Sequence, residues 1–166
     1  VPLAGLFLCI QLWIYLYNLF QRIRYYLLGL SSKYFGSMTI FSRIIAGEIP
    51  SYKIAENEKF YAFLDIFPLR EGHVLVVPKN ETDNLFDLPA EYLSEILLFA
   101  QPIAKAIEKS FDCNRCGISV IGLEVPHAHL HLVPIRSAND LNFIQEKPKA
   151  SDVALKKVQE KILAAL

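Results

Sequence analysis

The segment PHAHLHLVP (residues 126–134) holds three of the four histidines in a chain of 166 residues. Histidine alternates there with small or apolar residues, which is the period-two pattern of a half-buried strand. We therefore predict a strand over residues 128–134, with all three imidazoles on one face. At a rise of about 3.3 Å per residue, alternate rings are expected about 7 Å apart, with His129 in the middle. Three rings so placed can flank one phosphate-sized group.

Imidazole titrates near neutral pH, so a row of histidines can attack a phosphorus atom, donate protons and carry charge around a single bond. Two other interpretations stay open. The rings can be bonded within the strand and have only a structural role, or they can bind a metal ion. A catalytic metal usually needs three ligands that converge on one point, and residues i, i+2 and i+4 of a straight strand do not easily supply them.

The chain resembles the histidine triad (HIT) superfamily of nucleotide hydrolases and transferases, whose signature is His-x-His-x-His-x-x among hydrophobic residues. The resemblance extends from Met38 to about Pro134 and includes TIFSRIIAGEIP (39–50), AFLDIFP (62–68) and GHVLVVPK (72–79). It implies cleavage of a phosphoramidate or phosphoanhydride at the α-phosphate of a purine nucleotide, through a nucleotidyl-histidine intermediate and without a cofactor. A nucleotide-binding module with little catalysis is the alternative.

By this resemblance, His129 is expected to be the nucleophile and His131 to donate a hydrogen bond to the leaving group. His127 and His73 are expected to hold His129 in its reactive tautomer, with His73 near His127. Asp65 lies at a predicted strand end, where a carboxylate can accept hydrogen bonds from the two hydroxyls of a ribose. The residues expected to enclose the base are Ile40, Phe41, Ile44, Phe63 and Ile66. A short helix packed on a sheet would bury the same apolar side chains.

The segment Gly122–Pro126 leads into the triad and departs from the family pattern. Many members have a longer segment with Asn, Gln and often Ser or Thr at three positions where this chain has Ile121, Leu123 and Glu124. Backbone N–H groups of such a turn can cradle phosphate oxygens, so Glu124 is a candidate contact through its main chain, with its side chain pointing away. The loss of polar side chains at Ile121 and Leu123 favours the binding-module alternative.

The order of the predicted elements indicates an α+β fold, with an antiparallel meander sheet, one long helix and a C-terminal helix. A short helix over residues 40–45 is expected to end before Gly47. The long helix is predicted to begin with Pro89 and to be kinked at Pro102, and Ser151 is predicted to cap the C-terminal helix. The predicted strands cover residues 53–56, 60–65, 73–77, 117–121 and 128–134.

Residues 1–37 differ in composition from the predicted HIT domain, residues 38–166. Residues 1–20 carry no charge and are apolar on every helical face, which is about the length that spans a bilayer. Basic residues follow with no acidic residue before Glu48, which predicts a cytoplasmic domain anchored to the inner face of a membrane. The second interpretation is that translation starts at Met38, the only methionine, and that the upstream segment is not native. In either case we expect residues 1–37 to be dispensable for folding and catalysis.

Charge and cysteine content restrict the partners of the chain. Of 17 Lys and Arg residues, three lie before Met38, which leaves 14 against all 17 Asp and Glu in residues 38–166. Without a basic cluster, polymeric nucleic acid is not an expected partner. The three cysteines suit a reducing compartment, and Cys113 and Cys116 are predicted to lie in a loop.

Two further expectations come from the resemblance. Members that bind structural zinc have a cysteine pair near the start of the domain and a histidine where this chain has Glu81, so no metal is expected here. Family members usually form two-fold dimers through the long helix and a strand, which predicts a homodimer with Ala62 and Tyr92 as candidate interface residues.

Overall fold

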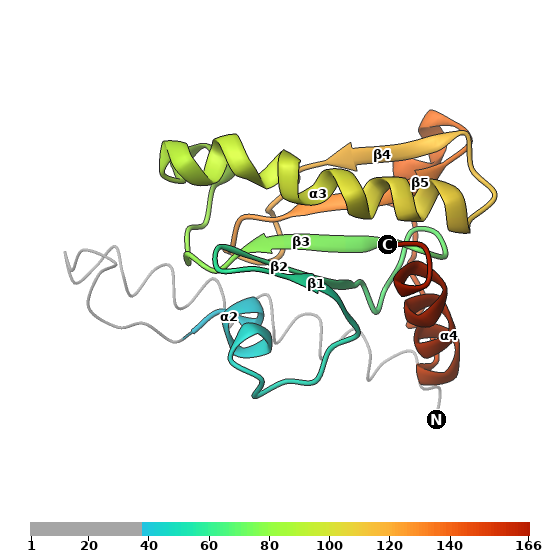
Figure 1. The fold of residues 1–166 in the computed structure, drawn as a ribbon, viewed down its shortest axis with the longest axis horizontal. Coiled ribbons are helices and arrows are strands. Elements are labelled where there is room, and N and C mark those ends of the chain that lie inside the picture. Colours follow the sequence, from blue (N-terminus) through green and yellow to red (C-terminus); the bar gives the residue numbers. More distant parts are fainter. Residues whose placement is uncertain (1–37) are drawn as a thin grey trace, which may run out of the picture. The chain divides into compact units, whose positions relative to one another are not determined.

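Five antiparallel strands form a sheet in the order β1-β2-β3-β5-β4 in the computed structural model, which describes residues 38–166 (Figure 1). The strands are β1 Lys53–Glu56, β2 Phe60–Leu64, β3 Val74–Pro78, β4 Arg115–Ser119 and β5 Leu130–Ile135. The helices are α2 Ile40–Ile45, α3 Ala90–Ser110 and α4 Asp152–Leu163, with short 3-10 helices η1 Leu85–Asp87 and η2 Ala138–Leu141. The α+β fold with one long helix and a C-terminal helix is confirmed.

The two faces of β2 and β3 are both buried, so these strands are apolar throughout. Successive side chains of a strand point to opposite faces. Leu64 and Val74 accordingly belong to a core shared with α3 and α4, whereas Phe63 and Leu75 belong to a second core shared with α2. The sheet therefore separates a large core from a smaller one, and His131 of β5 pairs with Leu75 on the side of the smaller core.

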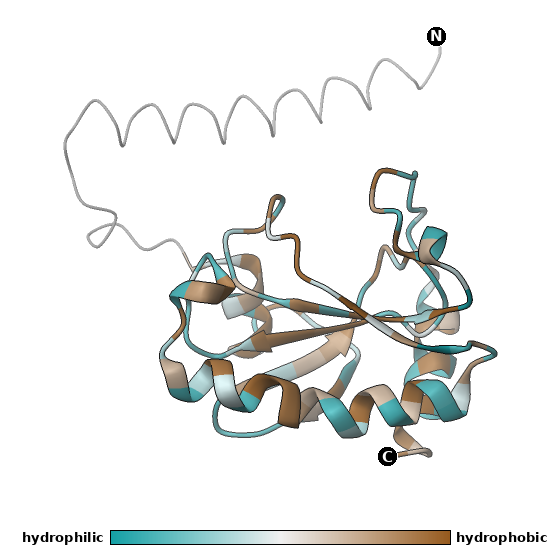
Figure 2. Cartoon of the chain, turned by 90° about the horizontal axis from the view of Figure 1, so that it is seen from above, coloured by the Kyte–Doolittle hydropathy of each residue, from teal (hydrophilic) through white to brown (hydrophobic). Residues whose placement is uncertain are grey.

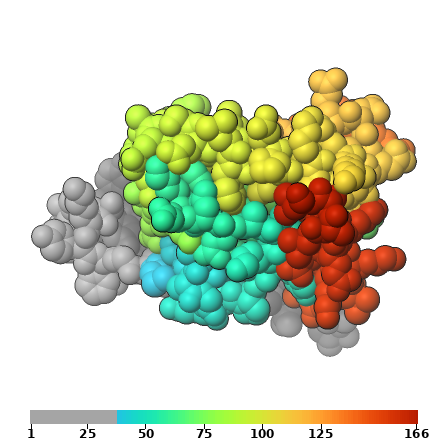
Figure 3. Space-filling model, in the orientation of Figure 1, coloured from blue at the N-terminus to red at the C-terminus, as the bar shows by residue number. Residues whose placement is uncertain are grey.

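The helix α3 runs along one face of the sheet, as the view from above shows (Figure 2). It packs beside α4, and the two helices cover much of the face seen in Figure 3. The buried residues of α3 are Ile96, Ala100, Ile103, Ala106 and Ile107. These residues recur with helical period and form one apolar stripe, whereas Leu97 on the same helix is exposed. The helix begins at Ala90, with Pro89 as its N-cap, and continues through Pro102 to Ser110.

The strand that carries the triad begins later than predicted. β5 starts at Leu130, because the backbone before it bonds elsewhere: Ala128 N–H donates to the carbonyl of Thr82 (2.7 Å), in the loop after β3. His127 and His129 consequently precede the strand, and only His131 lies on it. The prediction of one strand over residues 128–134 with three imidazoles in a row was wrong at this point.

Other boundaries shift by a few residues. β4 covers Arg115–Ser119 rather than 117–121, so Cys116 lies on the strand and only Cys113 lies in the preceding loop. Both cysteines are free thiols. Within residues 38–166, no helix combines the length and the apolar character needed to cross a membrane. The predicted membrane span, residues 1–37, lies outside the described part of the chain.

Candidate active site

His129 has one ring nitrogen bound and one free. Its Nδ1 lies 2.7 Å from the backbone carbonyl oxygen of His127. A carbonyl only accepts hydrogen bonds, so Nδ1 carries the proton and Nε2 carries an unshared electron pair. Burial lowers the pKa of His129 below its ordinary value, which keeps the ring neutral at pH 7. The ring is therefore held neutral, with the electron pair of Nε2 free.

His127 uses both of its ring nitrogens within the protein. Nε2 lies 2.8 Å from the carbonyl oxygen of Pro78, and Nδ1 lies 2.7 Å from the hydroxyl of Thr39, which donates to it. Thr39 is also the N-cap of α2, and its backbone N–H donates to the carboxylate of Glu81 (3.2 Å). The buried His127 ring thus joins α2 to β3. It holds His129 through its backbone carbonyl rather than through its ring.

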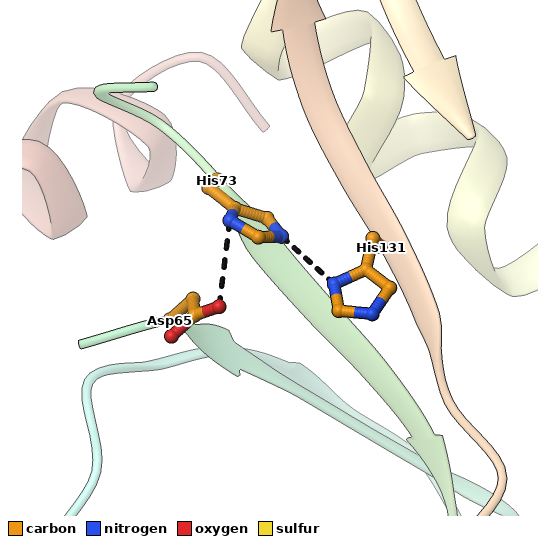
Figure 4. Close-up of side chains that lie close together, drawn as sticks. All are labelled: Asp65, His73 and His131. Carbon is orange, nitrogen blue, oxygen red and sulfur yellow. Dashed lines mark hydrogen bonds and ion pairs between the residues drawn. The ribbon is translucent and has the colours of Figure 1, made fainter. Parts of the chain in front are cut away.

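His131, His73 and Asp65 form a row across the ends of three neighbouring strands (Figure 4). His73 Nδ1 accepts a hydrogen bond from the backbone N–H of Leu69 (3.2 Å), so the proton of His73 is on Nε2. Nε2 then donates to Nδ1 of His131 (3.0 Å), which leaves the proton of His131 on its own Nε2. The site therefore pairs a ring nitrogen with a free electron pair, on His129, and a ring N–H donor, on His131.

The strand register explains this row. Leu64 pairs with Val74, so Asp65 and His73 face one another just beyond the ends of β2 and β3, where Asp65 N–H donates to the carbonyl of His73 (3.0 Å). Leu75 pairs with His131, which places His73 and His131 at diagonal positions on one face of the sheet. The prediction that His73 lies near the first triad histidine was wrong, since its partner is the third.

Asp65 is a half-buried carboxyl group beside the ring of His73. Its Oδ1 accepts the backbone N–H of Phe67 (2.8 Å), and its Oδ2 lies 3.4 Å from Nδ1 of His73. Burial raises the pKa of Asp65 to about 6, and burial followed by the charge of His131 lowers the pKa of His73 to about 3. Because the His73 ring is neutral at pH 7, its contact with Asp65 is not an ion pair.

The rings of His129 and His131 lie closer together than the sequence predicts. Their centroids are 4.7 Å apart, and the rings meet edge to face. The expected spacing of about 7 Å assumed a straight strand, which His129 precedes. Phe41 of α2 packs edge-on against His129 at 5.1 Å between centroids. This contact places α2, a predicted base-binding element, directly against the ring of His129.

Comparison with known proteins agrees with this arrangement. The HIT domain family matches residues 46–138. The chain belongs to the histidine triad (HIT) family. It is 36% identical over 129 residues to adenosine 5′-monophosphoramidase HNT1 of Saccharomyces cerevisiae, a match that covers 76% of this chain and 82% of that protein.

Two solved HIT structures have the same fold. A Hit-like protein from Bartonella henselae has a TM-score of 0.70 and 31% identity, covering 81% of this chain and all of that one. The histidine triad nucleotide-binding protein from Candida albicans has a TM-score of 0.54 and 34% identity, covering 75% of this chain and 94% of that one. The chain is accordingly an enzyme of the HIT family of nucleotide hydrolases and transferases.

The donor atoms of this HIT site do not converge as metal ligands would. Within residues 38–166, Asp65, His73 and His131 are the one group of three potential ligands whose atoms lie within 4.8 Å of one another. Asp65 and His131 contact opposite nitrogens of the His73 ring, as Figure 4 shows. A tetrahedral ion needs its ligands around a single point. Both nitrogens of His73 have hydrogen-bond partners within the protein, Leu69 N–H and His131 Nδ1, an arrangement that fits ring positioning better than a metal centre.

The predicted base-binding residues separate into two groups. Phe41, Ile44 and Phe63 are buried in the smaller core, whereas Ile40 and Ile66 have exposed fractions of 49% and 40%. Only the exposed pair offers open apolar surface.

Glu124 lies exposed on the loop that leads into the triad. Burial, the largest effect, raises the pKa of Asp65 and lowers that of His129, and the negative charge of Glu124 raises the pKa of both. Its side chain therefore lies within electrostatic reach of the site.

Sequence reasoning missed two residues of this HIT site, both in the segment 142–149 (the C-terminal site loop). The ring of Phe143 meets that of His131 edge to face, with centroids 4.7 Å apart. The ammonium group of Lys147 lies 5.6 Å from the centre of the Phe143 ring. The only local signal was one aromatic residue in a polar stretch, which does not distinguish a site residue from a surface one.

Proposed function

We propose that this HIT enzyme transfers the nucleotidyl group of a purine nucleotide from a leaving group X to His129 and then to water. The observation that carries the proposal is the hydrogen bond from Nδ1 of His129 to the carbonyl of His127, which leaves Nε2 unprotonated and unbound. A covalent intermediate divides one difficult displacement into two easier ones. No step requires a metal ion or a cofactor.

The first step joins Nε2 of His129 to the α-phosphorus. As the N–P bond forms, the P–X bond breaks and its electron pair leaves with X, which takes a proton from water. His131 Nε2–H lies beside the nucleophile and donates a hydrogen bond to X, which stabilises the charge that develops there. In the second step water attacks the phosphorus, the electron pair returns to Nε2, and one proton is released with the nucleoside monophosphate.

Adenosine 5′-phosphoramidate is the proposed substrate, because two relatives at 36% identity are adenosine 5′-monophosphoramidases. In the complex, the carboxylate of Asp65 accepts hydrogen bonds from the ribose hydroxyls, since its Oδ2 has only a neutral ring beside it. Ile40 and Ile66, the exposed pair, flank the base, with Phe41, Ile44 and Phe63 behind them. The backbone of Glu124 contacts the phosphate.

The test measures binding and turnover on the same preparation. We expect the purified chain to hydrolyse adenosine 5′-phosphoramidate to AMP and ammonia, and to bind AMP in calorimetry. Tight AMP binding without turnover would identify the nucleotide-binding module instead. Activity that disappears with a chelator and returns with added zinc would identify a metal-dependent hydrolase.

We also propose that residues 38–166 fold without residues 1–37 and form a homodimer through α3 and β4. β4 is an edge strand next to α3, and edge strands pair readily with other chains. Leu97, Leu98 and Ile118 on these elements have exposed fractions of 54%, 67% and 48%. Of the interface residues named from the sequence, Ala62 is fully buried in the large core and so is not free to join a partner, whereas Tyr92 of α3 is partly buried against that core.

Light scattering of residues 38–166 at micromolar concentration is expected to give the mass of two chains. Leu98→Glu places a charge on the apolar face of α3 and should give the mass of one chain. Val153→Glu is the matched control, since Val153 is also an exposed apolar residue of a helix but lies on α4. A monomer for the parent domain, or a dimer that Leu98→Glu leaves intact, would contradict this interface.

A further inference from the structure

The C-terminal site loop is held against the site at both ends. Before it, Asp140 of η2 pairs with Arg70 (2.9 Å), which belongs to the loop between β2 and β3. After it, the backbone N–H of Ala150 donates to the carbonyl of Ile66 (2.9 Å), next to Asp65. This ion pair and this hydrogen bond hold residues 142–149 beside the row formed by Asp65, His73 and His131.

Within this loop, Phe143 and Lys147 approach the donor side of the site. Phe143 packs on His131, and the half-buried Lys147 lies over Phe143. Burial, the largest effect, raises the pKa of Asp65 and lowers those of His73 and His131; the positive charge of Lys147 lowers the pKa of all three. The ammonium group therefore lies within electrostatic reach of all three residues of the row.

Lys147 has no carboxylate partner. None of the ion pairs formed by residues 38–166 includes it, although seven other lysine or arginine side chains in this range have one. A half-buried ammonium group loses part of its hydration, and an anion at hydrogen-bonding distance would compensate for that loss. Lys147 lies over Phe143, whose ring contacts the imidazole of His131 that faces the leaving group, and this position indicates which anion it is.

We propose that Lys147 is a specificity-determining residue that binds the anionic leaving group of a phosphoanhydride. The substrates would then include nucleotides whose α-phosphate is bonded to a second phosphate, in addition to phosphoramidates. This inference rests on the proposed roles of His129 and His131.

The chemistry of the two leaving groups differs at one point. As His129 Nε2 bonds to the α-phosphorus, the P–O bond of a phosphoanhydride breaks and its electron pair goes to the departing phosphate. That phosphate gains a negative charge, which the Lys147 ammonium group stabilises most strongly in the transition state. The nitrogen of a phosphoramidate takes a proton from water as it leaves and departs as neutral ammonia, so it keeps no negative charge for Lys147 to bind. Removing the charge of Lys147 should therefore affect one substrate class and spare the other.

The experiment compares ADP with adenosine 5′-phosphoramidate on the full chain. Lys147→Gln is expected to lower kcat/KM for ADP by about tenfold or more, and to change that for the phosphoramidate less than about twofold. Lys147→Arg should retain most of the ADP activity, because it keeps the charge. The matched control is Lys149→Gln, which removes an exposed lysine of the same loop and should leave both substrates unchanged.

Three outcomes would overturn the proposal. The first is an equal loss of kcat/KM for both substrates in Lys147→Gln, which would show that Lys147 only supports Phe143 and His131. The second is no loss of kcat/KM for either substrate. The third is a parent enzyme that hydrolyses the phosphoramidate but not ADP. Failure of the parent on both substrates would instead reject the proposed function itself.

Discussion

Replacement of His129 by alanine is expected to lower kcat on adenosine 5′-phosphoramidate by at least about 10³-fold. The variant loses the only ring nitrogen of the triad that combines a free electron pair with a defined tautomer. Neither of the other rings can replace it, because His127 uses both nitrogens and the Nδ1 of His131 is occupied by His73. Initial rates of AMP release measure the effect.

Mass spectrometry of protein quenched during turnover separates a nucleophile from a residue that only supports the site. The parent chain is expected to carry one nucleotidyl group, and peptide mapping should place it on His129. His129→Ala should carry none. The control is Lys149→Gln, which should show the same adduct as the parent. An adduct on another histidine, or turnover by His129→Ala close to that of the parent, would remove His129 from this role.

The free energy of unfolding is expected to fall as the pH drops from 6.5 towards 3. Burial lowers the pKa of His73 and of His131 to about 3 in the folded chain, from 6.5 in an exposed histidine. Below pH 6.5 the unfolded chain therefore binds protons that the folded chain does not. Each of the two rings contributes up to about 1.4 kcal/mol of lost stability per pH unit in this range.

Asp65 acts in the opposite direction. Its pKa is raised by burial from 3.8 to about 6, so the folded chain takes up a proton near pH 6 that the unfolded chain takes up only near 3.8. Between these values Asp65 offsets part of the loss from one histidine. Urea unfolding at pH 7, 6 and 5 measures the net slope.

Two variants separate these contributions. His73→Asn keeps an acceptor for the Leu69 N–H but does not titrate, so its stability should fall less steeply with pH than that of the parent. Asp65→Asn removes the group that opposes the histidines, so the free energy of unfolding of this variant should fall more steeply as the pH drops. Parallel curves for the parent and both variants would show that these groups do not have the shifted pKa values on which the expectation depends.

Local patterns in the sequence predicted the elements of this HIT fold well. The apolar runs of β2 and β3, the short helix α2 and the Ser151 cap of α4, whose side chain accepts from Ala154 N–H, all occur where expected. These features depend on contacts between residues a few positions apart. The repeated histidines likewise mark the site, since all three lie within residues 127–131.

The errors at the site have a different origin. The start of β5 is set by a hydrogen bond from Ala128 to the loop after β3, and alternation of residue types continues through this point without a change. The proposed role of Lys147 depends on the position of its loop, which is held by the Arg70–Asp140 ion pair and by the hydrogen bond from Ala150 N–H to the carbonyl of Ile66. No local periodicity reports on such contacts.

By itself, the sequence determined that this protein has a HIT fold and that its chemistry is centred on residues 127–131, because period-two alternation and the spacing of the histidines are properties of adjacent residues. Only the tertiary structure decided which nitrogen of each ring carries the proton. His73 and His131 are 58 residues apart, and Thr39 and His127 are 88 apart. Strand order and register bring these partners together, and a tautomer is defined by the partner that each nitrogen meets.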